Sequence, residues 1–200
     1  MKRALLLLLL ISCTYEPTAP RYIIDGDTVV LNNGDTIRLA GIDTPEKGDA
    51  NYDRAAYELQ RRIINAKLEL EGTQDDMYGR KVRFVTANGK NVNVEMVREG
   101  WARTLMHKGT KYEQELEQAQ TEAIIQQKGI WKVDDREYKR LSHRCAELGC
   151  PGSIAISSTQ GEAYYNCACS TANLIAKENI QCHPTLQDAI LKGLRETRRC

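Results

Sequence analysis

The sequence predicts a mixed α+β protein that is mainly β: a five-stranded barrel of the OB type with flanking helices, followed by a small cysteine-rich module. Three observations predict it. Strand-like and helix-like segments follow one another as strand-strand, helix, three strands, helix, an order that suits a small closed barrel with helices on its side. Two Asn-Gly pairs mark tight turns. Six of the seven cysteines lie in the last 60 residues.

The first hairpin is predicted from two strand-like runs, Tyr22–Leu31 and Thr36–Ile42, which flank the pair Asn33-Gly34. Asn-Gly is the strongest short hairpin signal, because a type I′ turn needs positive φ at both central residues. A two-residue loop of this kind places Val29 opposite Arg38. Two β-strands joined by a tight turn are therefore expected at the start of the fold.

The same register predicts which side chains meet. It places Asp27 opposite Ala40, so that Asp27 and Arg38 lie on one face as diagonal neighbours. Asp43 has the opposite parity to Arg38 and reaches the same place only if the chain bends, for which Gly41 is the expected hinge. The hairpin thus offers an acid and an arginine together, with further acids just past a bend.

The other elements follow from periodicity. A helix is predicted from Asn51, with an apolar stripe that runs from Ala55 to Ala66. "LELEG", which ends at Gly72, is a strand, and "KVRFVTANGKNVNV" forms two short strands about a second Asn-Gly turn. "NVEMVREG" is a short helix closed by Gly100, and a last amphipathic helix is capped by Gly129.

The length and the net charge of the chain limit the number of domains and the classes of function that are possible. A chain of 200 residues allows one domain of common size and a small one; we expect an OB-type domain over residues 21–135 and a cysteine-rich module over 141–200, and a monomer. The net charge of +1 with 28% charged residues is typical of a soluble globular protein. It argues against a protein that binds nucleic acid through bulk positive charge, so phosphate contacts must come from individually placed residues.

The N-terminus predicts export. "MKR" followed by "ALLLLLLI" is a charged and then an apolar segment of a signal peptide, over residues 1–12. The apolar run is too short to span a bilayer. "LISC" resembles a bacterial lipoprotein cleavage box, which implies lipidation of Cys13, a tether over 13–20 and anchoring in the cell envelope, at the outer membrane of a two-membrane cell. The alternative is an ordinary signal peptide and secretion.

Four segments in series carry a resemblance: "IDGDTVVL", "IRLAGIDTPE", "DMYGRKVRFV" and "NVEMVREGWA". In this order and spacing, over Tyr22 to Trp131, they resemble the staphylococcal nuclease (thermonuclease) family. The resemblance implies an OB-fold barrel and a calcium-dependent endonuclease, a hydrolase that cleaves phosphodiester bonds of DNA, RNA or both and leaves 3′-phosphates.

Six functional residues carry over by their motifs. The resemblance implies that Asp27, Asp43 and the backbone carbonyl of Thr44 bind calcium, and hard oxygen ligands are what calcium prefers. It implies that two arginines bind phosphate and that a glutamate acts as general base; these are Arg38, Arg80 and Glu46. Paired arginines suit phosphate oxygens, and a carboxylate can deprotonate an attacking water.

The chain also departs from the family. Tyrosines that pack against the bound nucleotide in family members are replaced, in an ungapped alignment, by Met106 and Lys108. Tyr112 or Tyr78 are the aromatic residues that could serve instead. Taken singly, the acids could be turn residues and the arginines surface ion pairs. The rival functions are a non-catalytic nucleic-acid-binding envelope protein and a scaffold whose tail binds a partner.

The cysteine-rich tail resembles the zinc module of the Ada DNA-repair protein. Two features disagree with a zinc site: Thr197 replaces one expected cysteine, and Cys167 and Cys169 are separated by a single residue. In an exported protein, six cysteines can form three disulfides, which stabilise a small module with a thin core. We therefore favour disulfides over Zn²⁺, and the pairing is open at this point.

Overall fold

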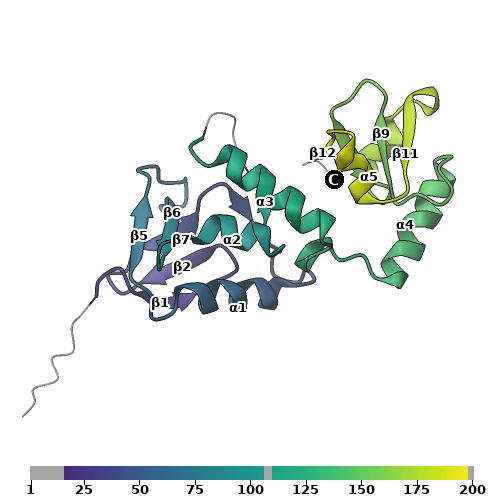
Figure 1. Ribbon diagram of the computed structural model, residues 1–200. Coiled ribbons are helices and arrows are strands. Elements are labelled where there is room, and N and C mark those ends of the chain that lie inside the picture. The colour runs from purple at the N-terminus through teal and green to yellow at the C-terminus, as the bar shows by residue number, and fades with distance from the viewer. Residues whose placement is uncertain (1–15, 106–109, 198–200) are drawn as a thin grey trace, which may run out of the picture.

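The computed structural model describes residues 16–105 and 110–197. Figure 1 shows two lobes joined at the end of a long helix, with a separate sheet in each. The first lobe contains these elements: β1 (Pro20–Ile23), β2 (Thr28–Leu31), β3 (Thr36–Leu39), β4 (Ile42–Asp43), α1 (Tyr52–Ile63), β5 (Leu68–Glu71), β6 (Lys81–Ala87), β7 (Lys90–Asn91), α2 (Val92–Arg98), β8 (Arg103–Thr104) and α3 (Glu113–Ile125).

The first sheet has the order β1-β2-β3-β6-β5, with β7 paired to β6, and β4 pairs with β8 separately. The mixed α+β class is therefore confirmed. Within the described residues no recorded pairing joins β1 to β5, so the recorded sheet is an open path rather than a closed barrel. The strand expected over Tyr22–Leu31 is divided, because the chain bends between β1 and β2.

The predicted register of the first hairpin is wrong by one residue. Thr28 lies opposite Arg38 and Val29 opposite Ile37, whereas a two-residue loop would pair Val29 with Arg38. Leu31 N–H donates to the Asp35 carbonyl at 2.9 Å, and only Gly34 of the Asn-Gly pair has a positive φ, 89°. The loop therefore has three residues and ends in a left-handed glycine, the next most common hairpin connection.

The second Asn-Gly pair behaves as predicted. Asn88 and Gly89 both have positive φ, 52° and 74°, and Ala87 pairs directly with Lys90 across a two-residue turn. The same dipeptide thus gives different loops in the two hairpins.

The helices differ from expectation at their ends. In α1 the buried stripe is Ala55, Leu59 and Ile63, but the helix stops at Ile63, so Ala66 is buried beyond it. Helix α3 stops at Ile125, before the expected cap at Gly129.

The core of the first lobe lies between the sheet and the helices. Its buried residues include Val29, Leu31, Ile37, Leu59 and Met96. Asn93, wholly buried on α2, holds the helix to the sheet: its amide oxygen accepts from Val85 N–H at 2.9 Å and its nitrogen donates to the Ala40 carbonyl at 2.8 Å. Asn93 therefore fixes the backbone at Ala40, three residues before Asp43.

The second lobe has a four-stranded sheet of order β11-β9-β10-β12. Its elements, and the 3₁₀ turn that leads into it, are η1 (Gly129–Trp131), α4 (Asp135–Glu147), β9 (Ala155–Ser158), β10 (Ala163–Asn166), η2 (Ser170–Leu174), η3 (Lys177–Asn179), β11 (Ile180–His183), α5 (Leu186–Leu191) and β12 (Arg195–Glu196).

Disulfides hold this second lobe together, as predicted. Cys145 is bonded to Cys167 and Cys150 to Cys182, which ties α4 and the segment after it to the sheet. Cys169 is also disulfide-bonded. No group of three or more His, Cys, Asp and Glu side chains in the described residues is arranged to hold a metal ion. The recorded bonds show cysteines in disulfide bridges rather than in a zinc site.

The expected signal peptide, Cys13, Met106 and Lys108 all lie outside the described residues. In the part of the chain that is described, no helix combines the length and the apolar character needed to cross a membrane.

Candidate active site

The site begins in the bend between β1 and β2. Asp27 N–H donates to the Asp25 carboxylate at 3.0 Å, and Ile24 N–H donates to the Thr28 carbonyl at 2.9 Å. Gly26 is required here because a Cβ would lie 2.7 Å from Cβ of Ala55 on α1. The bend is therefore packed against the helix, and it holds Asp27 in place.

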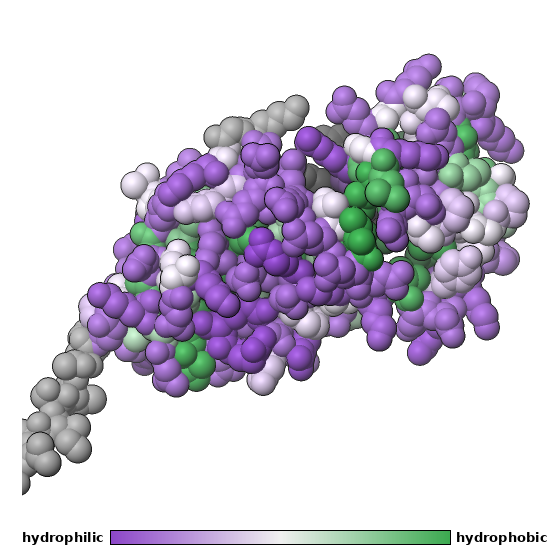
Figure 2. Space-filling model, viewed as in Figure 1, coloured by the Kyte–Doolittle hydropathy of each residue, from purple (hydrophilic) through white to green (hydrophobic). Residues whose placement is uncertain are grey.

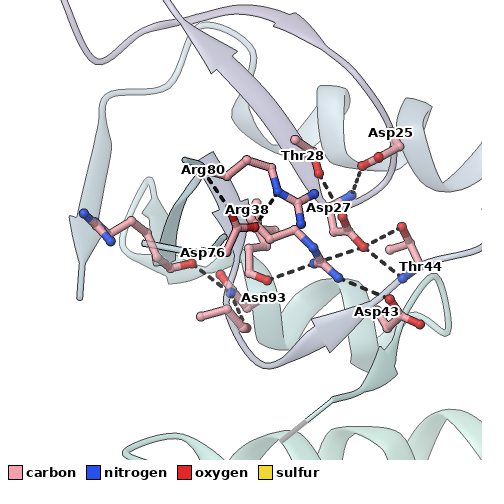
Figure 3. Close-up of polar contacts among 12 residues, drawn as sticks. Asp25, Asp27, Thr28, Arg38, Asp43, Thr44, Asp76, Arg80 and Asn93 are labelled. Carbon is pink, nitrogen blue, oxygen red and sulfur yellow. Dashed lines mark hydrogen bonds and ion pairs between the residues drawn. The ribbon is translucent and has the colours of Figure 1, made fainter. Parts of the chain in front are cut away.

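The Asp27 side chain is the most fully bonded group of the site (Figure 3). Its Oδ2 accepts from the Thr44 backbone N–H at 3.0 Å and from the Thr44 hydroxyl at 2.9 Å. The same oxygen pairs with Arg38 at 3.0 Å, while Oδ1 accepts from the Thr28 hydroxyl, also at 3.0 Å. Only 5% of Asp27 is exposed, so the carboxylate is fixed and largely removed from water.

Arg38 joins two carboxylates. Besides Asp27, its guanidinium donates to Asp43 Oδ1 at 3.2 Å and to the Leu39 carbonyl at 3.0 Å. Gly41, with φ of 71°, lies between Arg38 and Asp43, where a bend was predicted. Asp27 and Arg38 do meet, but not as diagonal neighbours of a regular ladder; the bend before β2 brings them together.

Burial and charge make Asp27 unusual. Burial raises its pKa, the Arg38 guanidinium opposes that effect, and the nearby Asp25 carboxylate adds to it, so that the pKa of Asp27 is raised to about 6. One arginine shared between two acids does not compensate fully for the loss of hydration. A further cation beside this carboxylate would favour its ionised form.

Arg80 lies in the loop before β6. Its Nε donates to Asp76 Oδ2 at 2.7 Å, and its backbone N–H donates to Asp76 Oδ1 at 2.9 Å. Val82 lies opposite Arg38 in the parallel β3–β6 pair, and Arg80 lies two residues before Val82 in the chain. Figure 3 shows both arginines within one close-up.

Glu46 stands apart from these residues. It is exposed, and its backbone N–H donates to the Asp49 carboxylate at 3.0 Å. Among the described residues, its own carboxylate has no recorded hydrogen bond or ion pair. The structure thus joins Asp27, Arg38, Asp43 and Thr44 by direct contacts, whereas the contacts recorded among the described residues do not connect Arg80 or Glu46 to this group.

Sequence reasoning missed two residues that shape the site. Asp76 fixes the Arg80 side chain, and its position four residues before the arginine was the available signal. Arg103 lies opposite Asp43 in the β4–β8 pair, and no local signal marked it. Of the two substitute aromatics, Tyr112 packs on Phe84 with ring centroids 4.6 Å apart, whereas Tyr78 is 77% exposed.

Comparisons with known proteins point to one family. The family model described as "Staphylococcal nuclease homologue" matches residues 36–133. Thermonuclease from Staphylococcus intermedius is 34% identical over 122 residues, which cover 55% of this chain and 73% of the relative. Endonuclease YncB from Bacillus subtilis (strain 168) is 35% identical over 138 residues, 62% of this chain and 65% of the relative. Asp27 precedes the model match, and the second lobe follows it.

Proposed function

Because this chain belongs to the staphylococcal nuclease family, a family of nucleases, we propose that it is a calcium-dependent endonuclease. It hydrolyses phosphodiester bonds of DNA, RNA or both and leaves 3′-phosphates. The observation that carries the proposal is the shared guanidinium of Arg38, held between a buried acid and a second acid beside it, Asp27 and Asp43.

The residues present fit calcium. Asp27, Asp43 and the Thr44 carbonyl would hold the ion, and all three are hard oxygen donors. The raised pKa of Asp27, caused first by burial, indicates negative charge that a cation would stabilise. The described residues contain no larger cluster of acids or histidines suited to a metal, so backbone oxygen and water would complete the coordination. When bound, calcium would supply Lewis acidity and positive charge at the phosphate.

The side chains of this chain supply the remaining chemistry. Arg38 and Arg80 would bind phosphate oxygens from two sides with planar, bidentate donors. Asp76 fixes the Arg80 side chain, because its carboxylate accepts from both the Nε and the backbone N–H of Arg80. Glu46, exposed and without a recorded partner in the described residues, would hold an attacking water and accept its proton.

Plasmid digestion by the purified soluble protein, with calcium and with chelator, tests this function. Glu46→Gln keeps the shape and removes the base, so cleavage should fall about 10²- to 10⁴-fold. Arg80→Lys keeps the charge and loses the bidentate geometry, so it should slow cleavage more than it weakens binding. Glu178→Gln and Arg136→Lys, both on exposed surface, are the matched controls. If the two site variants cleave at the parent rate, the proposal fails.

The alternative is a nucleic-acid-binding envelope protein without catalysis, or a scaffold that works through its tail. The presence of all six family residues favours catalysis. Binding of DNA in calcium without cleavage by the parent protein would favour the first alternative.

The location and organisation belong to the same proposal. Residues 1–12 are a signal peptide and 13–20 a tether, with a nuclease domain of the OB type over 21–135 and an accessory module over 141–200 in a monomer. A lipid on Cys13 anchors the protein in the envelope. Cys13→Ser should release the protein from membranes; equal retention of that variant would contradict the lipid anchor.

A further inference from the structure

The second lobe reaches the candidate active site. A cavity of about 260 Å³ lies at the junction of the lobes, and its lining includes Asp43 and Arg103 from the first lobe and Asn166 and Glu196 from the second. Asp43 is one of the two acids that hold Arg38. The cavity therefore opens beside the proposed phosphate position, and residues 33 or more positions beyond the family match form part of its wall only because the lobes are docked.

The docking of the lobes is built from several contacts. Arg103 Nε donates to the Glu196 carboxylate at 3.3 Å, and its guanidinium lies 5.0 Å from the Trp131 ring centroid. Arg195 pairs with Glu117 of α3 at 3.2 Å.

An apolar contact supports these ion pairs. Ile124 and Trp131, at the end of α3 and in η1, pack against Leu186 and Ile190 of α5. Figure 1 shows α3 running to this junction, and Figure 2 shows hydrophobic side chains gathered on the second lobe close to it. Charged and apolar contacts together hold β12 beside Asp43.

The charges that line the cavity argue against a phosphate as its ligand. The Asp43 and Glu196 carboxylates both contribute to the lining, and the Arg103 guanidinium is already paired with Glu196. Among the described lining residues the one cation, Arg103, is paired with Glu196, and Asp43 is already paired with Arg38, so the cavity offers no unpaired positive charge to a phosphate. The cavity therefore favours a neutral ligand that forms hydrogen bonds.

Asn166 lines the cavity and has a hydrogen-bond donor that the recorded contacts leave unused. Its amide oxygen accepts from the Ala168 N–H at 3.0 Å, which orients the side chain and leaves the amide nitrogen with no recorded partner among the described residues. An NH₂ donor beside carboxylate acceptors matches the edge of a nucleobase, where ring nitrogens and carbonyls accept and amino or imino groups donate.

We propose that this cavity is a nucleobase subsite, which receives the base of the nucleotide next to the scissile phosphate. The inference rests on the proposed nuclease function and assigns the second lobe a part in it: Asn166 is a specificity residue, and Arg103 with Glu196 positions the wall that carries it. The cysteine-rich lobe then helps to choose where a strand is cut.

The test uses Asn166→Asp in the full chain. The new carboxylate can still accept from the Ala168 N–H, so the local turn is kept while the NH₂ donor is replaced by an acceptor. Asn166→Ser removes the amide NH₂ group without adding charge, and its shorter hydroxyl can still accept from the Ala168 N–H, so it serves as the second variant. Asn173→Asp adds the same charge at an exposed position of the same lobe and is the control.

Two measurements are made on each protein. Binding of a fluorescein-labelled single-stranded DNA oligonucleotide in chelator should weaken about three- to tenfold in both Asn166 variants relative to the control, the expected loss for one hydrogen bond to a ligand. On an end-labelled DNA of defined sequence in calcium, KM should rise by the same factor with kcat little changed, and the distribution of cut positions should shift.

Equal binding and equal cut positions in Asn166→Asp, Asn166→Ser and Asn173→Asp would overturn the subsite. A parent protein that binds the oligonucleotide but never cleaves it would overturn the nuclease function instead. In that case, weaker binding by the Asn166 variants alone would still support the subsite.

Discussion

Asp27 and Glu58 are both buried carboxylates, with exposures of 5% and 3%, yet their surroundings differ in kind. Glu58 pairs with three arginines of its own helix, at 2.8 Å, 2.9 Å and 2.7 Å: Arg54, Arg61 and Arg62. Asp27 pairs with one arginine, which it shares with Asp43. Glu58 is therefore surrounded by three cations, whereas Asp27 has a share of one.

The pKa values move in opposite directions for this reason. Burial alone would raise the pKa of Glu58, but the hydrogen bonds from Arg61 and Arg62 overcome burial and hold that pKa below its usual value. At Asp27 burial wins over Arg38, and the pKa is raised to about 6. Glu58 has the surroundings of a structural ion cluster, whereas Asp27, with one shared arginine, has the surroundings expected of the calcium site that we propose.

The largest expected effect is on nuclease activity, which should fall when Asp27 is replaced but not when Glu58 is replaced. At limiting calcium, Asp27→Asn should lower the rate of plasmid cleavage about 10²-fold, because it removes a ligand charge, and higher calcium should restore part of the loss. Glu58→Gln should cleave within about twofold of the parent. Cleavage rates of both variants measured over a calcium titration test this prediction. Equal losses of activity in the two variants would contradict a different role for Asp27 and Glu58.

The next effect is on the pH dependence of the free energy of unfolding, measured with chelator present. A carboxyl group whose pKa is raised in the folded state stabilises the fold when protonated, and that stability is lost as pH rises through about 6. The Asp27→Asn variant does not lose this stability, because its amide does not ionise between pH 4 and pH 7. Its free energy of unfolding relative to the parent should therefore rise by about 3 kcal/mol between pH 4 and pH 7, at about 1.4 kcal/mol per pKa unit.

Urea denaturation of both proteins across this range provides the measurement. The difference should be flat above pH 7, where Asp27 is ionised in both the folded and the unfolded parent. A pH-independent difference would show that burial does not raise the pKa of Asp27.

Glu58→Gln should give the opposite sign. A lowered pKa means that the carboxylate stabilises the fold above its ordinary pKa and that this stability is lost as pH falls through the folded value. The variant should lose about 2 kcal/mol at pH 7, the size of a hydrogen-bonded charge, and the loss should shrink in acid. Thermal melts at pH 7 and pH 3 test this; a variant as stable as the parent at pH 7 would contradict it.

The smallest effect tests redundancy within the Glu58 cluster. Arg54→Gln removes an exposed partner while Arg61 and Arg62 remain, so it should cost only about 0.5 kcal/mol. A loss as large as that of Glu58→Gln would mean that the three arginines act as one unit.

Local signals account for much of the fold. Alternation and turn chemistry predicted the Asn88-Gly89 hairpin, and helical periodicity predicted the buried face of α1, because both depend on residues within a few positions of each other. The Glu58 cluster is local in the same way: its partners lie three or four residues away on one helix. The family motifs added the candidate site residues, which one sequence could not have distinguished from turn acids and surface arginines.

By itself, then, the sequence determined the order of the main elements of the first lobe, the mixed α+β class, the use of disulfides in the tail and the residues proposed for the site. Tertiary structure alone decided the three-residue loop at Gly34, the raised pKa of Asp27 and the cavity between Asp43 and Asn166. Propensity and periodicity act between neighbours along the chain, whereas loop choice, burial and charge balance depend on segments far apart in sequence. Asp27 and Arg38 meet through a bend packed on α1, and β12 meets the site only because α5 docks at the end of α3.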